Sequence, residues 1–224
     1  MSRAASIAKA LPNDYPLATL RSCESFLALL PREWSSYRSP QQLAWLSKWS
    51  QWFFAGTLLP WGEQLLVEQR AYPLWLGFGR FSLNSQGFTD PISVSHLSLA
   101  APCDIAQQQA ITQLVSGFIS PVCSTLAAVA GHPLALFWSN TAVRLIQSMQ
   151  RAEQKQVLSH LLQDIFTATH LTNGERNRLY QPFITLDQAH MPAIRQRRHC
   201  CMRFHLDKEL CPSCPLDRCP TSKL

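Results

Sequence analysis

Residues 39–60 read SPQQLAWLSKWSQWFFAGTLLP, and this segment indicates most strongly that the protein is built from helices. Ser39 followed by Pro40 is typical of a helix start, because the serine side chain can cap the first turn and proline fits its backbone. Proline in a helix interior removes a hydrogen bond and crowds the preceding turn. The pattern therefore predicts that this helix stops near Gly56 and Pro60 and that a further short helix covers 61–70.

Two further features of the predicted helices concern the core and the helix ends. Trp45, Trp49 and Trp52 recur at helical spacing and share one face, which we expect to pack in the core. Asp104 is placed to cap a helix that starts at about residue 105. Asn140 lies where a predicted strand gives way to a helix, and we expect it to be a cap as well, with a role near a cofactor or substrate as the alternative.

The remaining predicted elements precede and follow this helix in the sequence. Helices are expected over 16–30, from about 105 to Gly131 with a break or kink at Pro121, over 140–151 and over 153–169. Strands are expected as two or three short antiparallel segments within 72–94, over 133–138 and over 183–187, with a turn over 171–177. The sequence therefore predicts an α+β fold, mainly helical with a small antiparallel sheet. We expect a body over 1–190 and a C-terminal segment over 191–224 packed on it.

Composition indicates an ordered globular protein, since 46% of the 224 residues are hydrophobic and 15% are charged. The formal charge is +6, and the stretch from Arg195 to the end carries seven basic residues against three acidic ones. The basic excess thus belongs to the C-terminal segment, and we expect no nucleic-acid partner. Residues 105–143 carry no formal charge, but Gln residues and Pro121 interrupt the run, so we expect a buried core helix and no membrane span.

The most specific feature is RRHCCMRFHLDKELCPSCPLDRCP, residues 197–220, which holds five of the eight cysteines. The other three, Cys23, Cys103 and Cys123, are expected to be buried small hydrophobic residues. The N-terminus has no apolar signal-peptide region, so we expect a cytoplasmic protein, where disulfides are rare. Clustered thiols in such a protein indicate a metal or redox site, and a Cys-x-x-Cys pair places two sulfurs on one metal.

The adjacent pair Cys200–Cys201 bears on which metal is held. Neighbouring side chains in extended backbone point to opposite faces, so a single ion suits them less well than a larger binuclear cluster. A basic setting also suits the negative charge of a thiolate-ligated cluster. The motif therefore favours an iron–sulfur cluster over structural zinc. A solvated basic tail, or a zinc ribbon that touches nucleic acid, stays open as an alternative.

This C-terminal motif, HCC…CPSCPL, resembles that of the ferric-siderophore reductase family (FhuF-like). The segments LALFWSNTAVRLI (134–146), LTNGERNRLY (171–180) and SQWFFAGTLLP (50–60) are also similar to the family. The resemblance implies a [2Fe–2S] cluster held by Cys200, Cys201, Cys211 and Cys214. Nine residues separate the two pairs where about ten are expected, and Cys219 is additional. Cys219 could replace one member of the adjacent pair.

The resemblance further implies a function. Such an enzyme reduces Fe(III) in a hydroxamate siderophore by one electron, and Fe(II) is released in the cytoplasm because hard oxygen donors hold it weakly. The chain has no nucleotide-binding or hydrolase motif, so the electron is expected from a ferredoxin or a flavoprotein. Any membrane contact would be transient, at the inner membrane surface. The alternatives are a non-enzymatic protein with a structural four-cysteine zinc site, and a cluster-based iron or redox sensor.

Overall fold

The computed structural model describes residues 14–30, 39–77, 79–90, 98–157, 160–188, 191–207 and 209–217. Its α-helices are α1 (Cys23–Leu27), α2 (Pro40–Glu68), α3 (Asp104–Leu114), α4 (Ser120–Ala130), α5 (Ala135–Gln154), α6 (His160–Thr167) and α7 (Phe204–Asp207). Its strands are β1 (Asp14–Pro16), β2 (Arg70–Ala71), β3 (Arg80–Ser82), β4 (Leu99–Ala100), β5 (Phe183–Gln188) and β6 (Met191–Arg197). The predicted fold class, α+β and mainly helical with small antiparallel strands, is confirmed.

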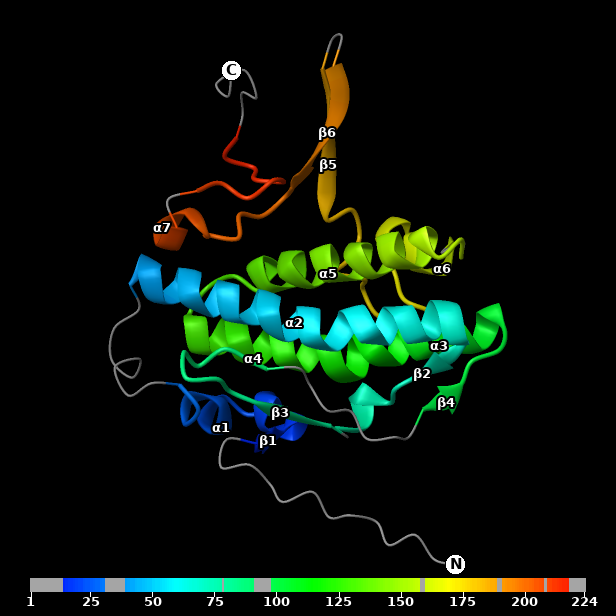
Figure 1. Cartoon of the computed structure of the whole chain (residues 1–224), viewed down its shortest axis with the longest axis horizontal. Coiled ribbons are helices and arrows are strands. Elements are labelled where there is room, and N and C mark those ends of the chain that lie inside the picture. Colours follow the sequence, from blue (N-terminus) through cyan, green and yellow to red (C-terminus); the bar gives the residue numbers. More distant parts are fainter. Residues whose placement is uncertain are drawn as a thin grey trace, which may run out of the picture.

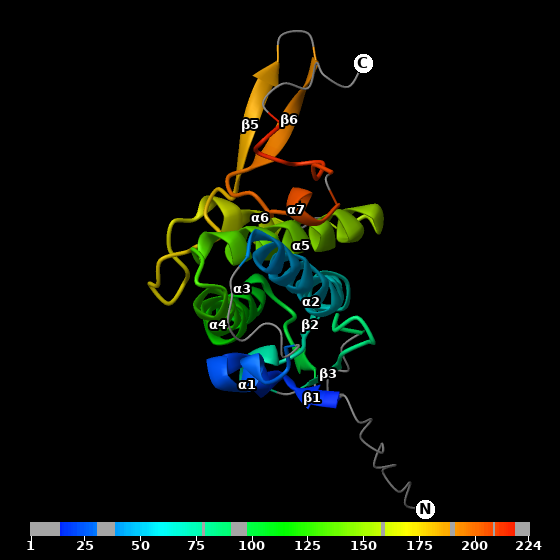
Figure 2. The same cartoon turned by 90° about the vertical axis from the view of Figure 1, so that its left-hand side faces the viewer.

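The molecule is layered around α2 (Figures 1 and 2). Helix α5 packs along one side of α2, and the α3–α4 segment lies on the other side. The β5–β6 hairpin stands above α5, and the C-terminal segment with α7 lies beside this hairpin, near the start of α2. Helix α1 and strands β1 and β3 form the opposite end of the molecule. The C-terminal cysteines are therefore next to the α2–α5 pair.

Helix α2 begins as predicted but does not end as predicted. The Ser39 hydroxyl accepts from the Gln42 amide at 3.2 Å, and the Gln42 side chain accepts from the Ser39 amide at 2.9 Å, which completes a capping box. The expected stop near Pro60 and a separate helix over 61–70 are wrong. The residue four positions before Pro60 is Gly56, and Trp61 beyond it is fully buried. Burial of the following turns thus outweighs the single lost hydrogen bond.

The apolar segment after β4 is one long helix. Helix α3 continues through a π-helical turn, Val115–Ile119, into α4, so Pro121 neither breaks nor ends it. The cap position is occupied by Cys103, and Asp104 is already inside the first turn, which corrects the expected cap. The predicted end at Gly131 is confirmed, since this residue adopts a left-handed conformation with φ 59°. By length and composition the helix over 104–130 could cross a membrane, and half of its most apolar window is buried inside the protein.

Helix α5 replaces a predicted strand. The strand expected over 133–138 is wrong, because a short apolar run has no periodicity that separates strand from helix. Asn140 is consequently not a cap but an interior residue of α5. The two helices expected over 140–151 and 153–169 are present as α5 and α6, and their separation after Gln154 lies a few residues later than predicted.

The described strands form three separate two-stranded antiparallel sheets. Strand β1 pairs with β3, β2 pairs with β4, and β5 pairs with β6. The strand predicted over 183–187 and the turn over 171–177 are confirmed, whereas β6 was not predicted. Within 72–94 the described residues contain β3 and an isolated bridge between Leu83 and Thr89, while 91–94 lie outside the description.

The N-terminal helix expected over 16–30 is shorter than predicted. The chain forms a 3-10 helix over Leu17–Arg21 and then α1, with Ser22 in extended backbone between them. The Ser22 hydroxyl accepts from the Ser25 amide at 3.3 Å. A capping serine in extended conformation therefore separates the two turns.

Burial agrees with the sequence at some predicted core positions and differs at others. Trp49 is 1% exposed, whereas Trp52 is 55% exposed, so the shared tryptophan face is only partly buried. Cys123 is buried as expected, but Cys23 and Cys103 are exposed, because they lie in short connections at helix starts.

Candidate functional site

The four cysteines of the predicted site come from two short segments that the fold brings together. Cys200 and Cys201 follow β6 after two intervening residues, and Cys211 and Cys214 flank a turn in the C-terminal segment. The Cys214 amide donates to the Cys211 carbonyl at 3.0 Å and closes that turn. Cys201 and Cys214 are 2% and 3% exposed, while the other two are half-buried.

The four thiols approach one another in two pairs. A hydrogen bond with the Cys211 thiol is the largest cause that lowers the pKa of Cys201, and the pKa of Cys211 is raised in turn. Burial raises the pKa of the Cys200 thiol, which also hydrogen-bonds with Cys214. Each pair therefore joins one cysteine after β6 to one cysteine of the Cys-x-x-Cys turn.

The pairs do not form a finished metal site. Among the described residues, no three His, Cys, Asp or Glu side chains are arranged as a group that could hold a metal ion. Cys219 lies outside the described residues, so its expected role as spare ligand is untested. The four thiols from the two segments instead interact as the pairs Cys200–Cys214 and Cys201–Cys211.

Backbone contacts fix the turn on the hairpin. The Arg197 amide donates to the Ser213 carbonyl at 2.9 Å, and the Gln196 side chain donates to the Asp217 carbonyl. On the other segment, the Met202 amide donates to the Cys200 sulfur at 3.3 Å. An amide directed at sulfur stabilises the thiolate form, as in metal-binding knuckles.

A buried polar network joins the adjacent cysteines to the central helices. The Ser47 hydroxyl of α2 donates to the Cys201 carbonyl at 2.7 Å. The Asn140 amide of α5 donates to Ser47 Oγ at 3.0 Å and to Ser50 Oγ at 2.8 Å. All three side chains are fully buried. The Cys201 backbone is thus positioned by residues about 60 and 150 positions earlier in the chain.

Arg197 completes this network from β6. Its side chain is 2% exposed, and its Nη2 donates to Asn140 Oδ1 at 2.8 Å and to the Ser139 carbonyl at 3.1 Å. The guanidinium also hydrogen-bonds with Cys201 and helps to lower the pKa of that thiol. Its Nε is buried without a hydrogen-bond partner among the described residues. A buried cation therefore lies directly beside the thiols.

The charges farther out are partly neutralised. Arg203 Nε pairs with Asp207 Oδ2 at 2.9 Å, and Lys48 of α2 pairs with Asp207 Oδ1 at 3.7 Å. Glu209 lies 3.5 Å from Arg203. Of these partly exposed pairs, only Lys48–Asp207 joins α7 to α2, and each pair contributes little stability in water.

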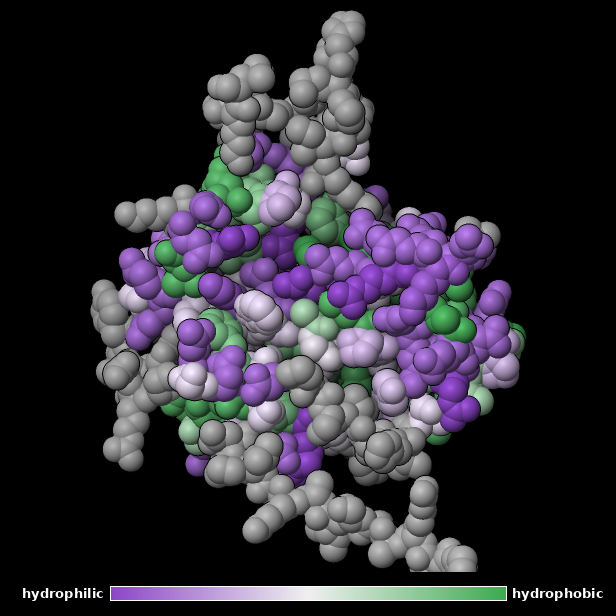
Figure 3. Space-filling model, viewed as in Figure 1, coloured by the Kyte–Doolittle hydropathy of each residue, from purple (hydrophilic) through white to green (hydrophobic). Residues whose placement is uncertain are grey.

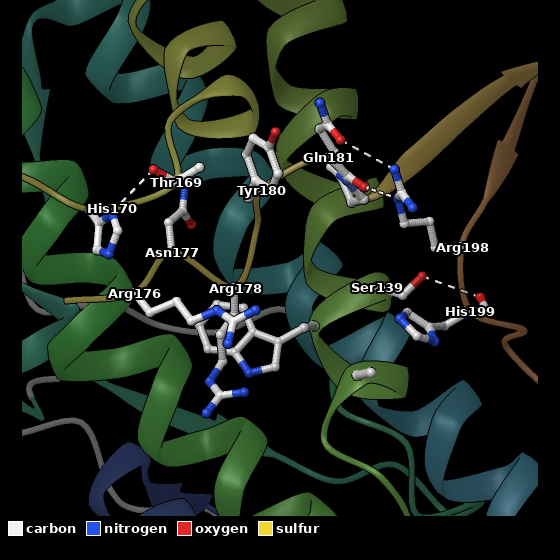
Figure 4. A pocket seen from close by; sticks show the side chains of 13 residues that line it. Ser139, Thr169, His170, Arg176, Asn177, Arg178, Tyr180, Gln181, Arg198 and His199 are labelled. Atoms are coloured by element: carbon white, nitrogen blue, oxygen red, sulfur yellow. Dashed lines mark hydrogen bonds between the residues drawn. The ribbon is translucent and has the colours of Figure 1, made fainter.

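A pocket of about 620 Å³ adjoins the cysteines. It lies between the start of α5, the loop over 168–182 and the residues that follow β6, as Figure 4 shows. Its lining residues are Ala135, Trp138, Ser139, Thr169, His170, Arg176, Asn177, Arg178, Tyr180, Gln181, Pro182, Arg198 and His199. His199 directly precedes Cys200, so the pocket wall continues into the cysteine pair.

Hydrogen bonds of the buried Asn177 side chain anchor the loop that forms one pocket wall. Asn177 is 3% exposed, and its side-chain amide donates to the carbonyls of Ile165 and Ala168, the latter at 2.8 Å. Its Oδ1 accepts from the Leu179 amide at 2.9 Å. This anchor leaves the neighbouring Arg176 and Arg178 exposed on the pocket side of the loop.

The sequence identified the cysteines but not the residues around them. Asn140 and Arg197 carried no signal of their partnership, because their contact joins residues 57 positions apart. The turn over 171–177 was recognised, yet nothing in the sequence showed that its arginines face the cysteine segment. The basic residues that precede the Cys-Cys pair, among them Arg197, were the available hint.

No family model and no curated protein matches the chain. The resemblance to ferric-siderophore reductases therefore depends on the residues quoted above.

Proposed function

We propose that the protein is a ferric-siderophore reductase that reduces Fe(III) in hydroxamate-type chelates by one electron. The observation that carries this proposal is the pairing of four thiols from two segments around a buried arginine. Four thiolates and Zn²⁺ together carry a charge of about −2, and this charge stays constant because zinc does not change its oxidation state. A structural zinc site therefore has no reduced state for a buried cation to stabilise. A redox centre gains a further negative charge on reduction, and a fixed neighbouring cation stabilises that state.

The donor set fits a [2Fe–2S] cluster. Cys200, Cys201, Cys211 and Cys214 supply four thiolates, the ligand number of that cluster. The buried Nε of Arg197 has no hydrogen-bond partner among the described residues, which suits a site that gains a negatively charged hydrogen-bond acceptor. When bound, the cluster would supply single electrons at low potential. Cys219 remains the candidate replacement ligand.

The residues of the chain perform three tasks in this proposal. The amide of Met202 and the guanidinium of Arg197 stabilise thiolate charge. Ser47 and Asn140 orient the Cys201 backbone from the rigid α2–α5 pair. The pocket beside His199 gives a chelate access to the cysteine segment without opening the core.

The electron balance requires an external electron donor, which we propose is a protein. One electron enters from a ferredoxin or a flavoprotein, and one leaves to each ferric ion, which then dissociates as Fe(II) because oxygen donors hold it weakly. A cytoplasmic location belongs to the same proposal. Figure 3 shows a mainly hydrophilic surface over α5 and α6, with hydrophobic residues in scattered patches, which is compatible with docking of a soluble partner.

The test is the metal content of protein purified without oxygen. We expect two irons and two acid-labile sulfides per chain, lost in Cys201→Ser and retained in Cys123→Ser, whose thiol is buried elsewhere. Cys219→Ser distinguishes a spare thiol from a ligand. The dithionite-reduced protein should then reduce a ferric hydroxamate in the presence of an iron(II) trap.

Two other outcomes have defined signatures. Stoichiometric zinc without iron or sulfide would favour the non-enzymatic structural site. A cluster that is reduced but never passes its electron to a ferric chelate would favour an iron or redox sensor.

A further inference from the structure

The pocket beside the cysteines is strongly cationic. Arg176 and Arg178 enter it from the loop over 168–182, and Arg198 enters from the end of β6 (Figure 4). His170 and His199 add imidazole groups, so the polar part of the wall consists largely of hydrogen-bond donors. The described lining contains neither Asp nor Glu. The pocket is therefore suited to a ligand that carries negative charge.

The side chains of two of these arginines have no hydrogen-bonded or ion-paired partner among the described residues. Arg198 is bound to Gln181, to its carbonyl through Nε and to its side-chain oxygen through Nη2 at 3.2 Å. For Arg176 and Arg178, by contrast, the described residues provide no side-chain hydrogen bond and no ion pair. Only Asn177 separates Arg176 from Arg178 on this anchored loop, and both arginines line the pocket. One ligand can therefore contact both guanidinium groups.

The pocket is also joined to the cysteine segment. Ser139 lines it and donates to the His199 carbonyl at 3.3 Å, and the next residue is Cys200. A ligand in contact with His199 would therefore lie next to the cysteine segment along the backbone, and none of the four cysteines is itself part of the pocket lining. An electron passed to such a ligand would not have to cross the core.

From these contacts we infer that the pocket binds ferric chelates of net negative charge, whose peripheral carboxylates pair with Arg176 and Arg178. This inference rests on the proposed reductase activity. Among ferric chelates, we expect those with free carboxylates, of which citrate is the simplest, to bind more tightly than hydroxamates that lack them. Guanidinium groups match carboxylates in geometry and bind them through paired hydrogen bonds. A neutral or cationic chelate would leave the two arginines unpaired. Reduction adds one negative charge to the chelate, so the same arginines also favour the reduced product.

Binding can be tested apart from electron transfer with gallium(III), which resembles ferric iron in charge and size but is not reduced. The full-length protein, as isolated, is titrated with gallium(III) citrate by calorimetry. Gallium(III) desferrioxamine B, a hydroxamate chelate without free carboxylates, is the comparison. Metal-free citrate and inorganic phosphate test whether the pocket accepts any anion. The matched variants are Arg176→Gln with Arg178→Gln, and Arg151→Gln, an exposed arginine on α5 outside the pocket.

We expect gallium(III) citrate to bind about tenfold more tightly than the desferrioxamine complex and than either metal-free anion. The double variant should bind it about tenfold or more weakly, and Arg151→Gln should bind it as the wild type does. The inference is overturned if gallium(III) citrate does not bind, if phosphate or free citrate binds equally well, or if the double variant is unaffected while its circular dichroism and melting curve are those of the wild type. Zinc at the cysteines would refute the reductase proposal and leave this binding result unchanged.

Discussion

The guanidinium of Arg197 donates to Asn140 Oδ1 at 2.8 Å in a region where both side chains are almost completely buried. Asn140 in turn donates to Ser47 and Ser50 of α2. One asparagine therefore connects β6, α5 and α2, and it holds the cation that lies beside the Cys201 thiol. A buried charge is tolerated here because its hydrogen bonds are supplied by the protein.

Replacement of Arg197 by Met should make the midpoint potential of the cysteine centre more negative. The reduced centre carries more negative charge, and the variant loses the adjacent cation that stabilises it. A shift on the order of 60 mV corresponds to a tenfold change in the one-electron equilibrium. A redox titration followed by electron paramagnetic resonance measures it. Arg197→Lys keeps the charge and should shift the potential less, so equal shifts in both variants would argue against an electrostatic role.

Replacement of Asn140 by Ala should lower the free energy of unfolding by about 2–3 kcal/mol, because it leaves a buried guanidinium without one of its acceptors. Urea denaturation measures the change. Gln150→Ala is the matched control, since Gln150 is exposed on the same helix. A similar loss in both variants would assign the effect to helix α5 in general.

Replacement of Gly62 by Ala should separate α2 from α5. An added Cβ would lie 2.4 Å from Ser148 Oγ and 2.7 Å from Ser148 Cβ, closer than van der Waals contact allows. We expect a loss of about 1–3 kcal/mol in urea denaturation. Ser148→Gly removes both crowding atoms. The loss caused by Gly62→Ala should therefore be smaller in the Ser148→Gly background, and an undiminished loss would contradict this packing explanation.

Cys123 should make the protein sensitive to alkaline pH. Burial raises the pKa of its thiol to about 12, from an ordinary value of 9.0. The folded-state pKa is the higher one, so the stabilising contribution is complete below pH 9 and is lost as the pH rises toward 12. Between pH 8 and about pH 10.5 the wild type should lose about 2 kcal/mol more than Cys123→Ala. If the unfolding free energies of the two proteins fell equally with pH, the Cys123 thiol would not be shielded from solvent in the folded state.

Local sequence signals predicted part of the fold well. The capping box at Ser39, the end at Gly131 and the turn over 171–177 all depend on a few neighbouring residues, and all three are present. The same local signals were wrong at Pro60 and over 133–138. In both places burial against distant residues outweighs local preference, and that burial has no signature within a window of ten residues.

The sequence by itself determined which residues can be ligands, because the Cys-Cys and Cys-x-x-Cys spacings are properties of consecutive residues. It also determined the mainly helical class through the periodicity of its apolar residues. Only the tertiary structure decided what surrounds the thiols. Arg197, Asn140 and the arginines of the loop over 168–182 meet through contacts between residues far apart in the chain. Such contacts depend on how helices and hairpin pack, which no local pattern specifies.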